Sequence, residues 1–326
     1  MTILVTGSSG HLGEALVRLL RQGGEQPRGI DLRPSPFTDL TGSITDRSFV
    51  RAALDGVRGV LHTATLHKPH VVTHSHQQFV DTNVTGTLTL LEAAADAGVE
   101  AFVQTSTTSV FGDALHPPPG ASAAWIDEDV APLPKNIYGA TKFAAEHLCR
   151  VIGRNRMMPV VVLRTSRFFP EESDDPEVRR ELTPENLQAL ELLHRRGDIA
   201  DMASAHVAAV ARAKAIGFGV FVVSASTPFT RDDLAALRND PAAVIRARFP
   251  ESEALFAAKG WRLPSAIDRV YDNTRARAVL GWQPRYDFGH VLDCLAAGRD
   301  FRSDLALAVG AKGYHEEIFD EGPYPV

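Results

Sequence analysis

The stretch that decides the fold is TILVTGSSGHLG, residues 2–13. A short β-branched run ends in Gly7, Gly10 and Gly13, and the pattern LGEALVRLL over 12–20 predicts a helix directly afterwards. In such a turn the first glycine permits tight bending, the second lets the backbone approach a pyrophosphate, and the third lets the helix pack close to the sheet. Because a helix N-terminus stabilises negative charge, the stretch predicts a dinucleotide-binding turn between the first strand and the first helix.

Strand and helix patterns alternate through the first half of the chain. Strands are expected at 28–31, 59–64, 101–106 and 159–164, with helices at 46–55, 74–97 and 138–152. Residues 113–136, which contain PPPG and two further prolines, are expected to be a loop. Strands that alternate with helices predict βαβ units, and right-handed crossovers then predict an α/β fold with a doubly wound parallel sheet. The ligand crevice of such a Rossmann fold lies at the carboxyl ends of the strands.

The second half of the chain is less regular. The run FGVFVVS at 218–224 predicts a further strand that returns to the sheet, whereas the segments around it are mostly helical patterns broken by proline and glycine. We therefore expect a dinucleotide-binding domain over 1–164 plus 198–224. A smaller substrate lobe with a C-terminal tail is expected from 165–197 and 225–326.

Composition and charge exclude several classes of protein. A net charge of −6 with a pI near 6.1 offers no polybasic surface for nucleic acid or for an anionic membrane. The longest apolar runs are strand-sized, far short of the ~20 residues of a membrane helix, and the N-terminus lacks the pattern of a signal peptide. Two cysteines, Cys149 and Cys294, form no disulfide framework, so we expect a reducing compartment, the cytoplasm.

Asp31 closes the second expected strand. A carboxylate at this place accepts hydrogen bonds from an adenosine ribose and repels a 2′-phosphate, so NAD is favoured over NADP. Arg33 partly offsets that repulsion. The alternative is that Asp31 only starts the turn before RPSP.

The run YGATK places Tyr138 and Lys142 on one face of a helix start. A free phenol with a pKa of ~10 is a poor base at neutral pH. A nearby ammonium and an oxidised nicotinamide both favour the phenolate, which then takes a proton from a substrate hydroxyl while hydride leaves its carbon. The alternative is an incidental pair on a surface helix. Upstream, residues 105–109 all carry hydroxyls, one of which is expected to hydrogen-bond the reacting oxygen.

Seven short motifs follow one another in a family order. They are TGSSGHLG at 6–13, HTAT at 62–65, NVTGT at 83–87, STTSVFG at 106–112, PKNIYGATK at 134–142, LRTSRFFP at 163–170 and NTRARAVLGWQPRY at 273–286. Together they resemble the extended short-chain dehydrogenase/reductase superfamily, specifically its NAD-dependent epimerase/dehydratase family of nucleotide-sugar enzymes. The resemblance spans nearly the whole chain. It implies a sugar or sugar-nucleotide substrate and a homodimer formed through two helices per subunit, about 85–97 and 138–152 here.

The resemblance also implies roles for single residues. Tyr138 is the expected base, Lys142 its electrostatic and ribose partner, and Thr107 the hydroxyl beside the reacting carbon. Substrate contacts are expected from His67, Thr107, Thr108, Tyr138 and Arg167. Cofactor contacts are expected from Gly7, Ser9, Gly10, His11, Leu12, Gly13, Asp31, Leu32, Arg33, Ser43, Ile44, His62, Thr63, Ala64, Thr65, Asn83, Thr105, Tyr138 and Lys142. His62 is expected as a neutral ring hydrogen-bonded to the backbone.

Departures from the family pattern concern the substrate. Dehydratases of the family carry an Asp-Glu pair after the catalytic threonine, whereas this chain has Thr108 and Ser109, which disfavours dehydration. In LRTSRFFP, Arg167 stands where the family has an asparagine, and it either binds a phosphate or carboxylate or pairs with the acidic run Glu171, Glu172, Asp174 and Asp175. The following span is short, and Arg195 and Arg196 approximate the family's phosphate-binding arginine. This segment also suits a smaller acidic sugar.

Five histidines fall in HTATLHKPHVVTHSH, residues 62–76. The steps from His67 to His70, His74 and His76 match no common tetrahedral ligand set, so no metal site is expected. His67 is instead the expected substrate contact.

Three functions remain open from the sequence. The first is an epimerase in which NAD oxidises a sugar hydroxyl and the hydride returns to the other face. The second is a sugar or sugar-acid dehydrogenase that releases NADH. The third is a dinucleotide-binding sensor without catalysis, which the Tyr138, Lys142 and Thr107 set argues against.

Overall fold

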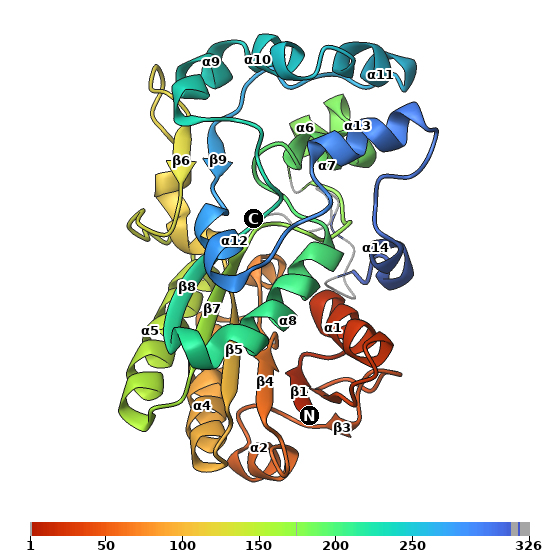
Figure 1. The fold of residues 1–326 in the computed structure, drawn as a ribbon. Coiled ribbons are helices and arrows are strands. Elements are labelled where there is room, and N and C mark those ends of the chain that lie inside the picture. The colour runs from red at the N-terminus through yellow and green to blue at the C-terminus, as the bar shows by residue number, and fades with distance from the viewer. Residues whose placement is uncertain (1, 174, 314–318, 320–326) are drawn as a thin grey trace.

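The computed structural model describes residues 2–173, 175–313 and 319, so most of the expected C-terminal tail and Asp174 lie outside the described residues. Seven strands form one parallel sheet in the order β3-β2-β1-β4-β5-β7-β8 (Figure 1). They are β1 (Ile3–Thr6), β2 (Arg28–Asp31), β3 (Leu40–Thr41), β4 (Gly59–His62), β5 (Ala101–Thr107), β7 (Val160–Thr165) and β8 (Phe218–Val223). The chain order reverses direction between β1 and β4, which confirms the expected doubly wound α/β fold.

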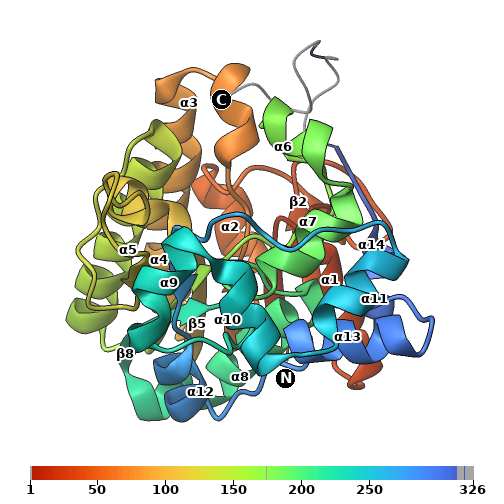
Figure 2. The same cartoon turned by 90° about the horizontal axis from the view of Figure 1, so that it is seen from above.

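Helices cover both faces of the sheet, as Figures 1 and 2 show from two directions. One face carries α1 (His11–Gln22), α8 (Ile199–Ile216), α12 (Thr274–Leu280) and α14 (Asp304–Val309), and the other carries α2 (Arg47–Ala53), α4 (Thr87–Asp96) and α5 (Ile137–Arg156). The inner strands are buried on both sides, which explains why β7 reads as the nearly continuous apolar run VVVLRT. Leu16 and Met202 lie in the core of the first face and Leu90 in that of the second, all fully buried. Each such side chain contributes ~1.5–3 kcal/mol by leaving water.

The expected helix over 74–97 consists of three helical segments. Ser75 caps α3 (His76–Phe79) with its hydroxyl on the Gln78 amide, and the π-helical turn η2 (Val80–Gly86) joins α3 to α4. A π-turn inserts an extra residue and is typical of functional sites. Here it carries Asn83.

A smaller lobe lies over the carboxyl edge of the sheet (Figure 1). It contains α6 (Pro176–Glu181), α7 (Pro184–Glu191), η4 (Arg231–Asp233), α9 (Leu234–Asn239), α10 (Pro241–Arg248), α11 (Ser252–Ala258) and α13 (Phe288–Ala296). Its own apolar core includes Phe256, Phe288 and Leu193. A two-stranded parallel sheet of β6 (Ala124–Ile126) and β9 (Arg269–Tyr271) completes it.

The expectation that 113–136 is only a loop was wrong. Residues Ala124–Ile126 form β6, and the 3-10 segment η3 (Thr108–Leu115) extends into the same stretch. The strand pairs with β9, which comes much later in the chain, so no local pattern could indicate it. Within the described part of the chain, no helix combines the length and apolar character needed to cross a membrane.

Candidate active site

The glycine turn lies at the floor of a cleft of about 1280 Å³ between the sheet edge and the smaller lobe. Gly7 has a φ of +70°, and a Cβ added to Gly13 would lie 1.9 Å from the Gly7 carbonyl oxygen. Both positions therefore require glycine. Helix α1 begins at His11 without a side-chain cap, which leaves the helix N-terminus as a place for an anion. The turn fits the pyrophosphate of a dinucleotide.

Asp31 lies at the end of β2 beside this turn. Its Oδ2 accepts a hydrogen bond from the Ser9 amide at 3.0 Å, and its Oδ1 accepts one from the Arg33 amide at 3.0 Å. Asp31 therefore starts the following turn and also lines the cleft, so the two alternatives for this residue are not exclusive. Leu32, Arg33, Ser43 and Ile44 line the same end of the cleft.

His62 lies behind the cleft rather than on its surface. Its Nδ1 and Nε2 are 2.7 Å from Thr6 Oγ1 and 3.0 Å from Thr87 Oγ1. The expected backbone-bonded ring was wrong, because the ladder of β4 uses the neighbouring backbone groups and two threonines reach the ring instead. Burial, with a smaller effect from the charge of Lys142, lowers the pKa of His62 to about 3, so the ring is neutral.

The His62 contact organises the cofactor side of the cleft through Thr6. Thr87 donates its hydroxyl proton to the Asn83 carbonyl, so it accepts from His62 Nε2, and Nδ1 then accepts from Thr6. The Thr6 oxygen in turn accepts the amides of Thr63 and Ala64 at 3.2 and 3.1 Å. Those two residues and Thr65 line the cleft.

Asn83 is a second buried residue that shapes the cleft from behind. Its Oδ1 accepts the Leu66 amide and the Thr65 hydroxyl, both at 2.9 Å. Its Nδ2 donates to the Leu66 carbonyl and to Thr141 Oγ1 on α5. Asn83 thus connects the loop after β4 to the helix that carries Tyr138 and Lys142.

Tyr138 and Lys142 both line the cleft from the first turns of α5. Asn136 caps this helix by accepting the Gly139 amide at 2.9 Å, which places Tyr138 beside the end of β5. Burial raises the pKa of Tyr138 to about 12, while its hydrogen bond with Thr107 acts in the opposite direction. Burial also lowers the pKa of Lys142 to about 8, against the charge of Glu146 and the thiol of Cys149.

A buried charge network supports this helix. Glu146, one turn after Lys142, accepts the Ser106 hydroxyl at 2.5 Å and pairs with Arg164 at 2.8 Å. The Arg164 guanidinium also lies 4.9 Å from the ring centre of Phe111. A buried ion pair is favourable only when its geometry and hydrogen bonds are good, and this one ties α5 to the ends of β5 and β7.

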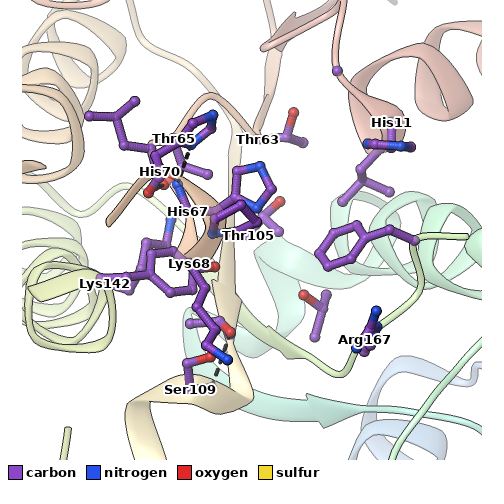
Figure 3. Close-up of a pocket in the computed structure, with 18 of the residues that line it drawn as sticks. His11, Thr63, Thr65, His67, Lys68, His70, Thr105, Ser109, Lys142 and Arg167 are labelled. Carbon is purple, nitrogen blue, oxygen red and sulfur yellow. Dashed lines mark hydrogen bonds between the residues drawn. The ribbon is translucent and has the colours of Figure 1, made fainter. Parts of the chain in front are cut away.

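Arg167 lines the cleft opposite Lys142, and Figure 3 shows His67 and Thr105 between them. Its Nη2 donates to the carbonyl oxygens of Glu171 and Glu172 at 2.8 and 2.9 Å. The Arg167 guanidinium therefore contacts the backbone of the acidic run, which was one of the two alternatives for this residue. Arg167 both faces the pocket and closes its own loop.

Three more arginines surround the far end of the cleft. Arg195 lies 3.0 Å from Glu191 and lines the cleft, whereas Arg196 is buried and lies 2.8 Å from the same carboxylate. Burial disfavours the Glu191 carboxylate, but Arg195, Arg196 and Arg167 outweigh it and hold the pKa of Glu191 far below its usual range. Arg269 on β9 also lines the cleft, beside Asp268. Arginine side chains and the carboxylates of Glu191 and Asp268 thus line the cleft together.

The histidine-rich stretch forms part of the cleft wall. The rings of His67 and His70 are 4.6 Å apart, and Phe169 is 5.7 Å from His67 and 5.8 Å from His11. Thus Phe169 lies between the glycine turn and the loop of His67. In the part of the chain that the structure describes, no three His, Cys, Asp or Glu residues are grouped as metal ligands.

All the expected site residues except His62 and Asn83 line one cleft. Several lining residues were not expected from the sequence, namely Phe169, Glu191, Arg269 and Lys312. Phe169 belongs to the motif LRTSRFFP and could have been found from it. Arg269 and Lys312 belong to late segments without a motif, and only folding brings them to the cleft.

A doubly wound fold with a glycine turn, Asp31 and a Tyr138–Lys142 pair defines a Rossmann-fold enzyme of the short-chain dehydrogenase/reductase type. The model of the family "NAD dependent epimerase/dehydratase family" matches residues 3–223. The chain belongs to this family of the extended short-chain type, whose cofactor is NAD.

Individual known proteins are also similar to this chain. A UDP-glucose 4-epimerase from Streptomyces lividans is 27% identical over 89% of this chain and 94% of its own length. An uncharacterized protein from Sinorhizobium fredii is 33% identical over 50% of this chain, which spans only 40% of that relative. A short-chain dehydrogenase/reductase superfamily protein from Agrobacterium tumefaciens, solved with bound NAD, has a TM-score of 0.66 and 25% identity over 91% of this chain and 96% of its own.

Proposed function

We propose that this chain is an NAD-dependent epimerase that acts by reversible hydride transfer at a hydroxyl-bearing carbon of a sugar or sugar nucleotide. The observation that carries the proposal is the placement of Tyr138, Lys142 and Thr107 on the wall of a cleft whose floor is the glycine turn. The UDP-glucose 4-epimerase relative supports the substrate class.

NAD, when bound, supplies the hydride acceptor. Tyr138 Oη takes the proton of the substrate hydroxyl, and Thr107 hydrogen-bonds the same oxygen, since it already contacts the Tyr138 hydroxyl. Lys142 holds positive charge beside the phenol and favours its ionised form. When the hydride returns, Tyr138 gives the proton back to the substrate oxygen.

The charge of the cleft supports an anionic substrate. Arg167, Arg195 and Arg269 all line the cleft. Planar guanidinium groups bind phosphate or carboxylate oxygens in pairs. A nucleoside diphosphate sugar or a sugar acid meets this requirement, and an uncharged sugar does not.

The second candidate is a sugar or sugar-acid dehydrogenase. Arg167 favours it, because a guanidinium at the substrate end of a short loop suits a small carboxylate. A dehydratase is disfavoured, because Thr108 and Ser109, the two residues after Thr107, carry no acidic group.

One experiment separates the candidates. Purified protein is incubated with NAD and a panel of UDP-sugars and uronic acids, while NADH absorbance and sugar products are followed together. Interconversion of two sugar epimers without net NADH supports the epimerase, and stoichiometric NADH formation replaces it with the dehydrogenase. Binding of NADH without turnover of any substrate would return the chain to the class of sensors.

We also propose a homodimer formed through α4 and α5, as the family resemblance implies. The outer face of these helices carries small and apolar side chains, among them Leu88, Ala140, Ala144 and Val151, that are at least partly exposed. Light scattering after gel filtration tests it, and a monomeric mass at micromolar concentration would contradict it.

A further inference from the structure

Three segments that are far apart in the chain meet beside the glycine turn. They are the start of α1 at His11, the loop after β7 at Glu171, and the segment after α14 at Lys312. The Glu171 carboxylate lies 2.6 Å from His11 Nε2 and accepts the Lys312 amide at 3.1 Å. The side chains of His11 and Glu171 are each only 8% exposed.

Further contacts hold each segment in the same place. Lys312 Nζ lies 2.6 Å from the Glu14 carboxylate on α1. In the loop after β7, the Glu171 carbonyl accepts from Arg167 and the Phe169 carbonyl accepts from Arg196. The loop over 167–173 and the segment 310–313 are therefore both fastened to the helix whose N-terminus faces the cleft.

Ionisation of Glu171 is consistent with this arrangement. Burial disfavours its carboxylate, but His11 and the amide of Lys312 outweigh burial, and the pKa of Glu171 lies below its usual value. The carboxylate is thus charged at neutral pH and attracts both neighbours.

We propose that Glu171 is a positioning residue that holds the loop 167–173 and the segment 310–313 over the glycine turn, and thereby limits how fast the dinucleotide enters and leaves. His11, Phe169, Lys312 and Gly313 line the cleft at this point, so the two segments lie beside the path of the cofactor. The inference rests on the NAD site of the proposed function. It also bears on the reaction, because an epimerase keeps its cofactor between two hydride transfers whereas a dehydrogenase must release it in every cycle.

The rate of NADH release tests the role of Glu171. Protein loaded with NADH is mixed with excess NAD in a stopped-flow instrument, and the loss of bound NADH fluorescence is recorded. Glu171→Gln is expected to release NADH about tenfold faster than wild type, because the neutral amide attracts His11 less strongly. Glu172→Gln is the matched control: this neighbour is exposed, and the change leaves the backbone carbonyl that Arg167 uses intact. It is expected to release NADH at the wild-type rate.

Two further variants separate positioning from stability. Glu171→Asp keeps the charge and is expected to release NADH more slowly than Glu171→Gln. Lys312→Met removes the contact with Glu14 at a partly exposed side chain, so it is expected to fold and to release NADH faster than wild type. Circular dichroism and the thermal midpoint without cofactor verify the fold of every variant.

Several outcomes would overturn the inference. One is that Lys312→Met and folded Glu171→Gln both release NADH at rates within about twofold of wild type. Another is that Glu172→Gln accelerates NADH release as much as Glu171→Gln does. Wild-type protein that binds no NADH would overturn the proposed function together with the inference. Normal NADH binding without turnover of any sugar would contradict only the proposed reaction.

Discussion

At the scale of single residues, the chemistry depends on one phenol. Tyr138 is buried, and burial raises its pKa to about 12 in spite of the hydrogen bond with Thr107, away from the value that a base needs. Lys142 lies one helical turn away, and Thr107 contacts the hydroxyl. The proton transfer therefore relies on positive charge near Tyr138, since burial opposes the phenolate.

The change Tyr138→Phe removes the acid–base group and keeps the ring. We expect kcat to fall by about 10²–10⁴-fold, the usual contribution of a positioned general base, with the affinity for NADH changed little. Product formation from the active sugar and NADH fluorescence titration measure the two effects. A variant with more than a tenth of wild-type kcat would show that Tyr138 is not the base.

The change Asp31→Ala removes the carboxylate that faces the expected adenosine ribose. The ratio of Kd for NADPH to Kd for NADH is expected to fall at least about tenfold, because repulsion of the 2′-phosphate disappears and Arg33 remains. Titration of NADH and NADPH fluorescence measures both constants. An unchanged ratio would mean that Asp31 acts only in the turn, where it accepts the amides of Ser9 and Arg33.

At the scale of elements, the start of α1 packs closely on the glycine turn and also presents the helix N-terminus to the cleft. The helix packs so closely on the turn that a Cβ on Gly13 would lie 2.6 Å from the Gly7 carbonyl carbon, in addition to its oxygen. Backbone atoms cannot give way as a flexible side chain can. The same close approach leaves the helix N-terminus on the floor of the cleft.

The change Gly13→Ala is expected to lower the free energy of unfolding by about 1–3 kcal/mol and to weaken NADH binding, because the helix must shift away from the turn. Gly23 at the other end of α1 is the matched control, since a Cβ there would lie 3.4 Å from its nearest neighbour. Urea unfolding and NADH titration measure both effects. Equal behaviour of Gly13→Ala and Gly23→Ala would show that the close approach has no consequence.

At the scale of the whole molecule, three buried histidines make the free energy of unfolding depend on pH. Burial lowers the pKa of His62 and His194 to about 3 and that of His206 to about 4. His206 Nδ1 donates to the Met202 carbonyl, so Nε2 accepts from Thr105, and His194 donates to the Arg269 carbonyl. All three rings are thus held neutral.

These histidines predict a loss of stability in mild acid. The unfolded chain binds protons near pH 6.5 and the folded chain only near pH 3–4, so the free energy of unfolding falls as the pH drops below 6.5. Each ring contributes a loss of about 2 kcal/mol between pH 6.5 and pH 5. Urea unfolding of wild type and His206→Gln at both pH values measures it. The variant is expected to lose about 2 kcal/mol less, and identical losses would contradict the assignment.

The sequence by itself determined the doubly wound fold, because strand runs, helix periodicity and the glycine turn are local patterns. Each of them can be recognised without knowing which distant segment it contacts. It also indicated most of the cleft, since the carboxyl ends of parallel strands meet at one edge and carry Asp31, Thr63 and Thr107 there. Only the tertiary structure decided which side chains cross that edge from elsewhere. β6 needs β9, Arg269 reaches the cleft from the smaller lobe, and Glu171 meets His11 and Lys312, because these contacts join positions whose separation along the chain leaves no periodic signal.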